Sequence, residues 1–424
     1  MPNPRQIAVK ALVSVDDEGG YSNIVLDRLL KESALSGADA ALASALFYGV
    51  LDRKVTLDYC LRPYCSRPLN KLSASVRNAL RIAAFQLLYM DRIPPFAAIN
   101  ESVSLVKRSK DKYAAGLVNA VLRSLQRGGK PALPTENTAK ALSVRCSCEE
   151  WLAQRLIDDY GFETAERILA AGLEPSATYL RVNTLKTTPD ELISDLAAEG
   201  LEAEKVDLVE NAVRLLRSSA ENTDAFRKGR FHVQDLSSQL CCAALDAQEG
   251  MRVLDVCAAP GGKTFTIAEH MQGKGEVVAR DLHPHRAELI VKGAERLGLE
   301  NVTASVGDAT VFDEALGSFD RVLCDVVCSG IGVIRRKPEI KYKSVFDADA
   351  LFDTQLKILT TSARYVARSG LLLYSTCTLL KKENHDVVTA FLKQNDDFFL
   401  VGEERTLMPY DNTDGFYFAL IKRK

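Results

Sequence analysis

Two cysteines in the second half of the chain follow apolar runs that could present them for chemistry. Cys328 comes shortly after a run that ends at Asp325, and Cys377 comes after a run that ends at Ser375. Both runs predict buried parallel strands, whose carboxyl ends share the edge of a sheet where ligands bind. A thiolate there could attack an electron-poor ring carbon, as cytosine requires before its C5 becomes nucleophilic. Two small thiols packed in a core are the alternative.

A small-residue loop in the segment VLDVCAAPGGKT, residues 253–264, predicts a cofactor site between a strand and a helix. It lacks the first glycine of a phosphate-binding loop, because Cys257 stands there, and it lacks the G-x-G-x-x-G spacing of a dinucleotide site. S-adenosylmethionine, which carries adenosine without phosphates, is the candidate that remains. An ordinary strand-to-helix connection is the alternative. The expected cofactor contacts in the loop are Cys257, Ala258, Ala259, Pro260, Gly261, Gly262 and Lys263.

Acidic residues end or closely follow three successive predicted strands. They are Asp255, Asp281 and Asp308. In an open parallel sheet all three would lie at the ligand-binding edge. We expect Asp281 to bind the ribose of the cofactor and Asp308 to lie near its adenine, although any one such acid could be a cap or turn residue.

Composition bounds the class of protein. The chain has 424 residues, of which 47% are apolar and 26% charged, so two or three globular domains are expected. The absence of a secretory h-region and of a long apolar stretch predicts a cytoplasmic protein without a membrane partner. The ten cysteines include no C-x-x-C pair, which predicts reduced thiols and no metal site. We expect a monomer.

Periodicity divides the chain into three predicted domains. Residues 1–130 repeat apolar residues at helical steps, which predicts a helical bundle. The second predicted domain spans residues 131–228 and is preceded by a linker over 129–145 that overlaps its start. It contains a predicted helix over 151–171 and a small α+β insert. The insert has strands at 179–183 and 213–216 and a helix at 189–199. Residues 229–424 alternate strands and helices, which predicts a Rossmann-like α/β domain with a mixed sheet of seven strands. The predicted strands are 252–256, 276–280, 302–306, 319–325 and 370–375, with a closing strand near 414–421 and helices at 284–297 and 350–366.

Charge is unevenly distributed along the chain. Residues 1–130 contain 19 Lys and Arg against 11 Asp and Glu, although the whole chain has a net charge of −2. A basic module on an acidic remainder is typical of a surface that binds phosphates. A solvated helical surface is the alternative.

The first 130 residues resemble the helical antitermination-factor fold known as NusB. The resemblance is carried by Arg5-x-x-Ala8, by Leu80-Arg81 with Phe85-Gln86-Leu87, by Ile99-Asn100-Glu101 and by residues 116–123. It implies an RNA-binding domain.

Taken together, the motifs resemble the RNA 5-methylcytosine methyltransferases of the NOL/NSUN/Sun group. The matching strings are RVNTLK (181–186), FHVQDLSSQ (231–239), CAAPGGKT (257–264), DVVCSGIGVIRRKPEIKY (325–342), YSTCTL (374–379) and DGFYFAL (414–420). The resemblance implies a SAM-dependent enzyme that forms 5-methylcytosine in small-subunit rRNA, at cytosine 967. It is strongest to the bacterial enzymes of the group and spans nearly the whole chain.

Site residues follow from this resemblance, and they would be harder to assign without it. Residue chemistry alone leaves Cys328 and Cys377 nearly tied as nucleophile. The resemblance implies that Cys377 adds to C6 of cytosine and that Cys328 helps break the bond between enzyme and RNA afterwards. It also implies that Asp325 and Lys263 contact the base and the cofactor. The family usually has proline where this chain has Val327, which leaves the position of Cys328 and Asp325 open.

A basic string follows Cys328 and predicts contacts with RNA phosphates. It comprises Arg335, Arg336, Lys337, Lys341 and Lys343. These side chains could hold RNA while the target base is turned out of its stack. Two other functions stay open. A non-catalytic ribosome-assembly factor is conceivable because of Val327, and a tRNA-directed enzyme would share every core motif.

Overall fold

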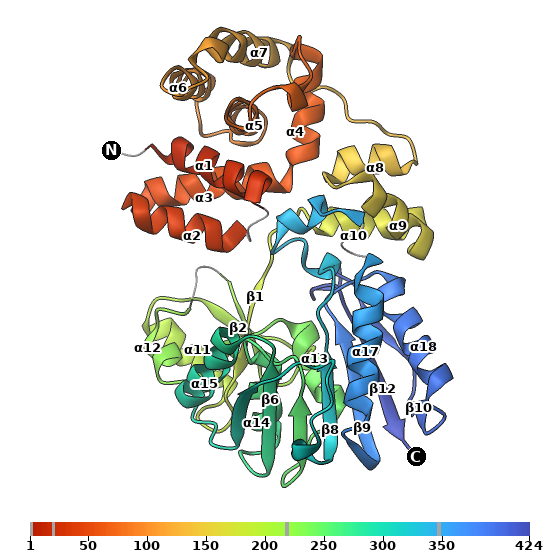
Figure 1. The fold of residues 1–424 in the computed structure, drawn as a ribbon. Helices are drawn as coiled ribbons and strands as arrows, with labels where there is room; N and C mark the ends of the chain where they lie inside the picture. Colours follow the sequence, from red (N-terminus) through yellow and green to blue (C-terminus); the bar gives the residue numbers. More distant parts are fainter. Residues whose placement is uncertain (1–2, 19–21, 217–219, 346–348) are drawn as a thin grey trace. The chain divides into compact units, whose positions relative to one another are not determined.

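The computed structural model describes residues 3–18, 22–216, 220–345 and 349–424. The chain forms two compact units (Figure 1). The first unit contains Met1–Glu174 and Ile334–Lys343, and the second contains Pro175–Val333 and Ser344–Lys424. Ten residues of the C-terminal half thus belong to the N-terminal unit. The predicted three-domain division stays a prediction.

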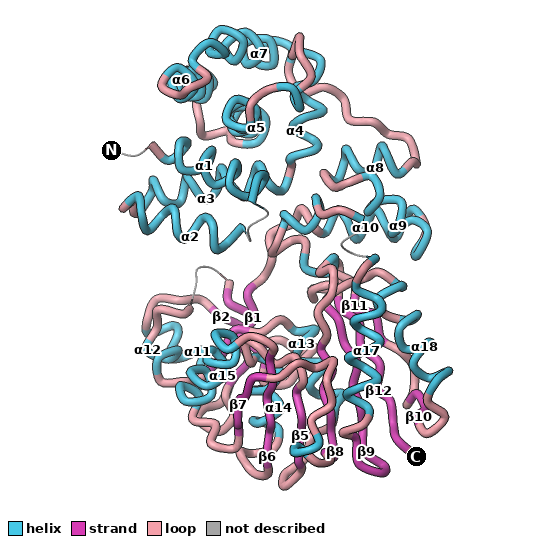
Figure 2. Tube along the Cα trace, viewed as in Figure 1, coloured by secondary structure: helices cyan, strands magenta, loops and turns pink. Residues whose placement is uncertain are grey.

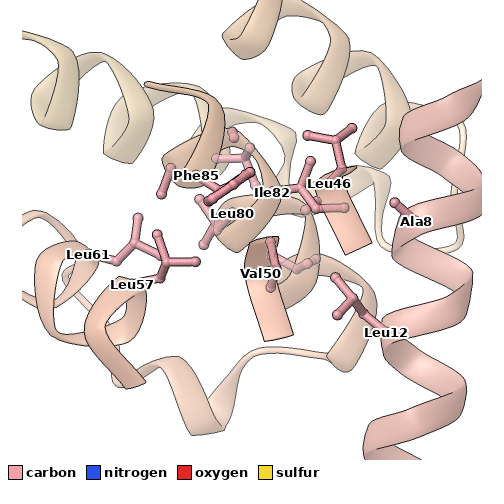
Figure 3. Packing of buried hydrophobic residues seen from close by; sticks show 14 of the residues in the cluster. Ala8, Leu12, Leu46, Val50, Leu57, Leu61, Leu80, Ile82 and Phe85 are labelled. Atoms are coloured by element: carbon pink, nitrogen blue, oxygen red, sulfur yellow. The ribbon is translucent and has the colours of Figure 1, made fainter. Parts of the chain in front are cut away.

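The first unit is helical, as its apolar spacing predicts. Its helices are α1 (Pro4–Glu18), α2 (Ser22–Ser33), α3 (Gly37–Asp52), α4 (Lys54–Leu61), α5 (Ala74–Tyr89), α6 (Pro95–Lys107), α7 (Ala115–Gly128), α8 (Ala139–Cys146), α9 (Glu150–Tyr160) and α10 (Phe162–Ala171), with short 3₁₀-helices η1 (Arg62–Tyr64), η2 (Leu69–Lys71), η3 (Lys112–Ala114) and η6 (Pro338–Tyr342). Helices α1 to α7 share one apolar core, in which Leu46, Leu57 and Leu80 are fully buried (Figure 3). The side chain of Arg81 is nearly buried beside this core and forms a bidentate pair with Asp58.

The segment after the bundle is more structured than the sequence indicates. The predicted linker over 129–145 is wrong in its second half, because α8 begins at Ala139 after Thr138, whose hydroxyl accepts the N–H of Ala141. The single helix predicted over 151–171 is two helices, since Gly161 between α9 and α10 has φ of +78°. Glycine adopts this backbone conformation freely, so the chain turns there.

Residues 334–343 are held by side chains and backbone of the first unit. Lys341 is fully buried, and its Nζ donates to the carbonyl of Asp52 at 2.8 Å. The hydroxyl of Tyr342 donates to the carbonyl of Leu51 at 2.5 Å, and Trp151 Nε1 donates to the carbonyl of Lys343 at 2.9 Å. The predicted phosphate contact of Lys341 is therefore wrong, because its ammonium is enclosed. The phosphate contacts of the other members of the basic string stay predictions.

The second unit contains a small antiparallel sheet with the order β2-β3-β1-β4 among its described residues. Its elements are β1 (Thr178–Val182), α11 (Pro189–Ala198), β2 (Ala203–Lys205), β3 (Ala212–Leu215), α12 (Asp224–Arg227) and β4 (Phe231–Val233). Helix α11 begins with a capping box between Thr188 and Glu191. The predicted strands and helix of the insert are confirmed within one or two residues.

The larger sheet has the order β10-β12-β9-β8-β5-β6-β7, with β11 paired to β12 (Figure 2). Strands β5 to β9 run parallel and β12 lies antiparallel to β9, so the predicted mixed Rossmann-like sheet is confirmed. Among the described residues it has eight strands where seven are predicted, because the short strands β10 and β11 both pair with β12. Its strands are β5 (Arg252–Asp255), β6 (Glu276–Asp281), β7 (Val302–Val306), β8 (Phe319–Asp325), β9 (Val366–Thr376), β10 (Phe398–Leu400), β11 (Arg405–Leu407) and β12 (Phe416–Arg423).

Helices cover both faces of this sheet and create a core on each. The helices are α13 (Leu236–Leu245), α14 (Gly262–His270), α15 (Pro284–Leu297), α17 (Leu351–Ala363) and α18 (His385–Gln394), with 3₁₀-helices η4 (Glu314–Leu316), η5 (Ile331–Val333) and η7 (Lys381–Glu383). Helices α13, α14 and α15 pack on one face, where Val253 and Leu323 point. Helices α17 and α18 pack on the other, where Leu254 and Val322 point. Neighbouring strand residues thus alternate between two cores, and the strand ends are left to form a site.

Candidate functional site

The small-residue loop lies at the carboxyl end of β5 and is bonded to the end of β6. Ala258 N–H donates to the carbonyl of Arg280 at 2.8 Å, and Ala259 N–H donates to Asp281 Oδ2 at 3.3 Å. Gly261 then enters α14 with φ of +109°, and a Cβ there would lie 2.3 Å from the ring of Phe265. The loop therefore requires glycine at this position, both for its backbone conformation and for space.

Lys263, in the first turn of α14, forms an ion pair across the sheet edge. Its Nζ lies 2.7 Å from Asp325 Oδ2 at the end of β8, and the hydroxyl of Ser375 donates to Asp325 Oδ1 at 2.8 Å. Burial alone would lower the pKa of Lys263, but attraction to the Asp325 carboxylate outweighs it and raises that pKa. The ammonium therefore stays charged at neutral pH. It also lies 5.0 Å from the centre of the Phe416 ring at the start of β12.

The three acids predicted from strand ends have different environments. Asp255 is buried and accepts the hydroxyl of Thr264 at 2.7 Å, and burial raises its pKa to about 7. It therefore braces the start of α14. Asp281 is also buried, and its Oδ1 accepts the N–H of His283 at 3.2 Å. Asp308 is exposed, and the N–H and hydroxyl of Thr310 that bind it lower its pKa.

The two cysteines singled out by the sequence meet at neighbouring strand ends. The sulfurs of Cys328, after β8, and Cys377, after β9, lie 3.2 Å apart, and both residues are partly exposed. The contact with Cys377 and burial raise the pKa of the Cys328 thiol well above its ordinary value. Cys328 is therefore protonated at neutral pH, which is the state of a hydrogen donor and not of a nucleophile. Which of the two sulfurs attacks stays a prediction.

Backbone contacts fix the loop that carries Cys377. Gly332 N–H donates to the carbonyl of Cys377 at 3.0 Å, and Gly415 N–H donates to the carbonyl of Gly332 at 2.9 Å. A Cβ on Gly332 would lie 1.8 Å from the carbonyl oxygen of Gly415. Three loops, after β8, after β9 and before β12, thus pass at backbone distance behind the nucleophile candidate. A Cβ on Gly415 would in turn lie 2.7 Å from the Cα of Gly332, which explains why a glycine precedes Phe416 in the DGFYFAL string.

The structure brings Lys263, Asp325, Cys328 and Cys377 together at one edge of the sheet. Asp281 lies beside the loop through Ala259, whereas Asp308 contacts its own turn. Sequence reasoning missed Glu383, Gln355 and Gly332, which hold the cysteine loops. The only signal for Glu383 was an acid shortly after an apolar run that follows Cys377.

The residues at this edge fit S-adenosylmethionine. The first turn of α14 leaves N–H groups without acceptors inside the helix, which suits a carboxylate. A Cβ on Gly262 would meet only Gln234, at 3.7 Å, so the backbone there is accessible. Asp281 and Asp308 at the ends of β6 and β7 suit hydroxyl and amino groups.

Comparison with known proteins gives the family. Residues 242–422 match the family described as 16S rRNA methyltransferase RsmB/F, residues 2–127 match the NusB family, and residues 148–220 match an RsmF/B-like ferredoxin-like domain. A Bacillus subtilis protein named "Probable ribosomal RNA small subunit methyltransferase B" is 40% identical over 99% of this chain and 98% of its own length. The chain belongs to the RsmB/F family.

Other relatives extend over the same length. The Yersinia pseudotuberculosis "Ribosomal RNA small subunit methyltransferase B" is 34% identical over 100% of this chain and 99% of its own. The crystal structure of PH0851 shares the fold, with a TM-score of 0.83 and 24% identity over 100% of this chain and 99% of that one. Members of the RsmB/F family are SAM-dependent methyltransferases, so the cofactor predicted from the loop is confirmed.

Two further observations concern the described part of the chain. None of the helices there combines the length and apolar character needed to cross a membrane. No group of three His, Cys, Asp or Glu side chains is placed there to hold a metal ion.

Proposed function

We propose that the protein methylates C5 of a cytosine in small-subunit rRNA, with Cys377 as the nucleophile. One observation carries the proposal: the sulfurs of Cys328 and Cys377 lie 3.2 Å apart at the edge where Lys263 and Asp325 form an ion pair. An RsmB/F methyltransferase with two thiols at this edge has the groups that cytosine C5 chemistry needs. The names of the relatives support rRNA as the substrate.

In the proposed reaction the Cys377 thiolate adds to C6, and an S–C bond forms. The electrons of the C5=C6 bond move into the ring, so C5 becomes nucleophilic. S-adenosylmethionine, when bound, supplies an electrophilic methyl group. Release then requires that C5 lose its proton, so that the C–H electrons restore C5=C6 and the C6–S electrons return to Cys377. We assign Cys328 to this release step. Once the Cys377 sulfur is bonded to C6 it no longer raises the pKa of Cys328, so Cys328 gives its thiol proton to solvent and, as a thiolate, accepts the C5 proton.

The remaining groups hold the reactants. We propose that the loop Cys257–Lys263 and Asp281 bind the cofactor, with Asp308 near its adenine and Asp325 between cofactor and base. We further propose cytosine 967 as the target, a cytoplasmic monomer, and RNA binding by the NusB-like region.

Single replacements of the two cysteines test the roles. With labelled S-adenosylmethionine and small-subunit rRNA, C377A should transfer no methyl group, because no sulfur adds to C6. C328A should accumulate a protein–RNA species that survives denaturing electrophoresis, because release fails. Methylation by C377A at the wild-type rate would contradict the assignment.

Mapping 5-methylcytosine in RNA from cells with and without the protein tests the substrate. Loss of the mark from one cytosine of small-subunit rRNA is expected. Loss of a tRNA mark would identify the tRNA-directed alternative, and no change would support a non-catalytic role. Val327 gives little support to that last possibility, because hydrogen bonds hold its loop without proline.

A further inference from the structure

A buried carboxylate lies behind both cysteine loops. Glu383, at the end of η7, is 1% exposed. Its Oε2 accepts the backbone N–H of Ser329 at 2.8 Å and Nε2 of Gln355 at 2.9 Å. Its Oε1 lies 3.5 Å from the hydroxyl of Thr378. The residue after Cys328 and the residue after Cys377 are therefore both bonded to one side chain.

Further contacts extend this network on either side of each cysteine. Gln355 Nε2 also donates to the carbonyl of Val327 at 3.0 Å, and the hydroxyls of Ser329 and Thr378 lie 2.7 Å apart. The hydroxyl of Thr376 donates to Asn384, the residue after Glu383, at 2.6 Å. The backbone on both sides of each cysteine is thus fixed by the pair Glu383 and Asn384 or by groups bonded to it.

From this geometry we infer that Glu383 is a positioning residue that holds the Cys328 and Cys377 loops in register. The inference rests on the proposed function, in which the two sulfurs act on one base. Glu383 is enclosed, so it does not touch the substrate. Glu383 accepts the Ser329 N–H and the second N–H of the Gln355 amide, whose first N–H goes to Val327, and a buried N–H without an acceptor is costly. In this chain the network does what proline at position 327 would do by fixing φ.

Replacing Glu383 by glutamine removes the carboxylate charge but keeps the ability to form hydrogen bonds. In E383Q the amide oxygen can accept the two N–H groups that Oε2 accepts, and the amide nitrogen can donate to Thr378. E383A removes every one of these contacts. A positioning role therefore predicts that E383Q is close to wild type and that E383A is not.

The rate of disulfide formation between Cys328 and Cys377 reports whether the two sulfurs are close, and it can be measured without RNA or cofactor. Diamide takes two electrons and two protons from a pair of nearby thiols, which become a disulfide, and is itself reduced to a hydrazine. We expect the full-length wild-type protein and E383Q to form the Cys328–Cys377 disulfide at rates within about threefold, and E383A about tenfold more slowly, because the bond tolerates only a narrow geometry. Mass spectrometry of alkylated peptides identifies the pair.

Steady-state methylation provides the second readout. For E383A we expect kcat to fall about 100-fold while KM for rRNA stays within threefold, because misplacement by about 1 Å impairs chemistry more than binding. E269A is the matched control for the disulfide assay. Glu269 is an equally buried acid of the same unit, and it pairs with Arg181 at 3.2 Å instead of with the cysteine loops. It should leave the disulfide rate of the folded protein unchanged.

Each outcome decides the inference. Wild-type disulfide rate and kcat in E383A would overturn it, and so would an E383Q as impaired as E383A, since charge would then be what matters. If E383A does not fold, Q355A replaces it, with an expected fall in kcat of about tenfold. Absence of 5-methylcytosine with wild-type protein would defeat the proposed function, yet the disulfide rates would still test the role of Glu383.

Discussion

Replacing Lys341 by methionine should stabilise the first unit at neutral pH. Lys341 is fully buried, and burial lowers its pKa from 10.5 to about 8. A difference of about 2.5 pKa units, at about 1.4 kcal/mol each, makes the charged form cost about 3.5 kcal/mol in the folded state. Methionine would leave the Asp52 carbonyl without this donor, which costs about 2 kcal/mol and offsets part of the gain. K341M should therefore gain about 1–2 kcal/mol at pH 7.

The pH dependence of stability shows whether the Lys341 ammonium destabilises the folded first unit. A lysine whose folded pKa is lowered binds fewer protons in the folded than in the unfolded state between pH 8 and 10.5. The stability of the wild-type unit should therefore rise through this window, and K341M should abolish the rise. Below pH 8 the full penalty is present in the wild type.

Trp151 provides the assay, because it is the only tryptophan of the chain and donates to the carbonyl of Lys343 in the first unit. Its fluorescence should report a midpoint about 3–6 °C higher for K341M at pH 7. Binding of rRNA should stay within about twofold, with an unchanged salt slope. K343M, which removes an exposed ammonium two residues away, is the control and should leave the midpoint unchanged. A lower midpoint for K341M, or a salt slope reduced by about one, would refute the reasoning.

Two further predictions concern the second unit. G332A should lower methylation about 100-fold, because its Cβ would lie 1.8 Å from the Gly415 carbonyl and the loops behind Cys377 must separate. Methyl-transfer kinetics measure it, and wild-type activity would contradict the close approach. K263M should also lower kcat about 100-fold, because Asp325 loses the cation 2.7 Å away. Calorimetry with S-adenosylmethionine separates lost binding from lost turnover, and a variant unchanged in both would exclude a role for the pair.

G116A is the control for the G332A prediction. A Cβ on Gly116 would meet nothing within 4 Å, and the residue lies in α7, where alanine is favourable. It should keep both activity and stability. A loss equal to that of G332A would mean that the glycine assay reports general damage.

Local sequence pattern predicts most of the fold. The strands at 302–306 and 319–325 and the helix at 284–297 have the predicted bounds, because uninterrupted apolar runs and periodic spacing are encoded within each segment. Gly161 and Ala139 show the limit. One positive φ splits a helix whose periodicity continues, and one threonine cap starts a helix inside a segment that contains prolines.

The site residues also divide into those that local sequence predicts and those that only the fold brings together. The loop 257–263 and the two cysteines are visible in sequence because strand-end positions imply a shared edge. Glu383 is not visible, since its role depends on Ser329, 54 residues earlier, and on Gln355. Lys341 was misassigned because a basic string has the same pattern whether its side chains face solvent or an interior carbonyl. Burial is a property of the whole fold, and local spacing does not encode it.

The ten residues 334–343 also constrain how this enzyme can be divided or recombined. They are encoded far downstream of the helical bundle with which Lys341 and Tyr342 make hydrogen bonds. A gene fragment that stops at residue 174 would lack the lysine and tyrosine that satisfy the Leu51 and Asp52 carbonyls. A chimera that exchanges the N-terminal half of two relatives would pair each half with a foreign decapeptide. Functional hybrids should therefore be those in which the decapeptide is transplanted together with the N-terminal half.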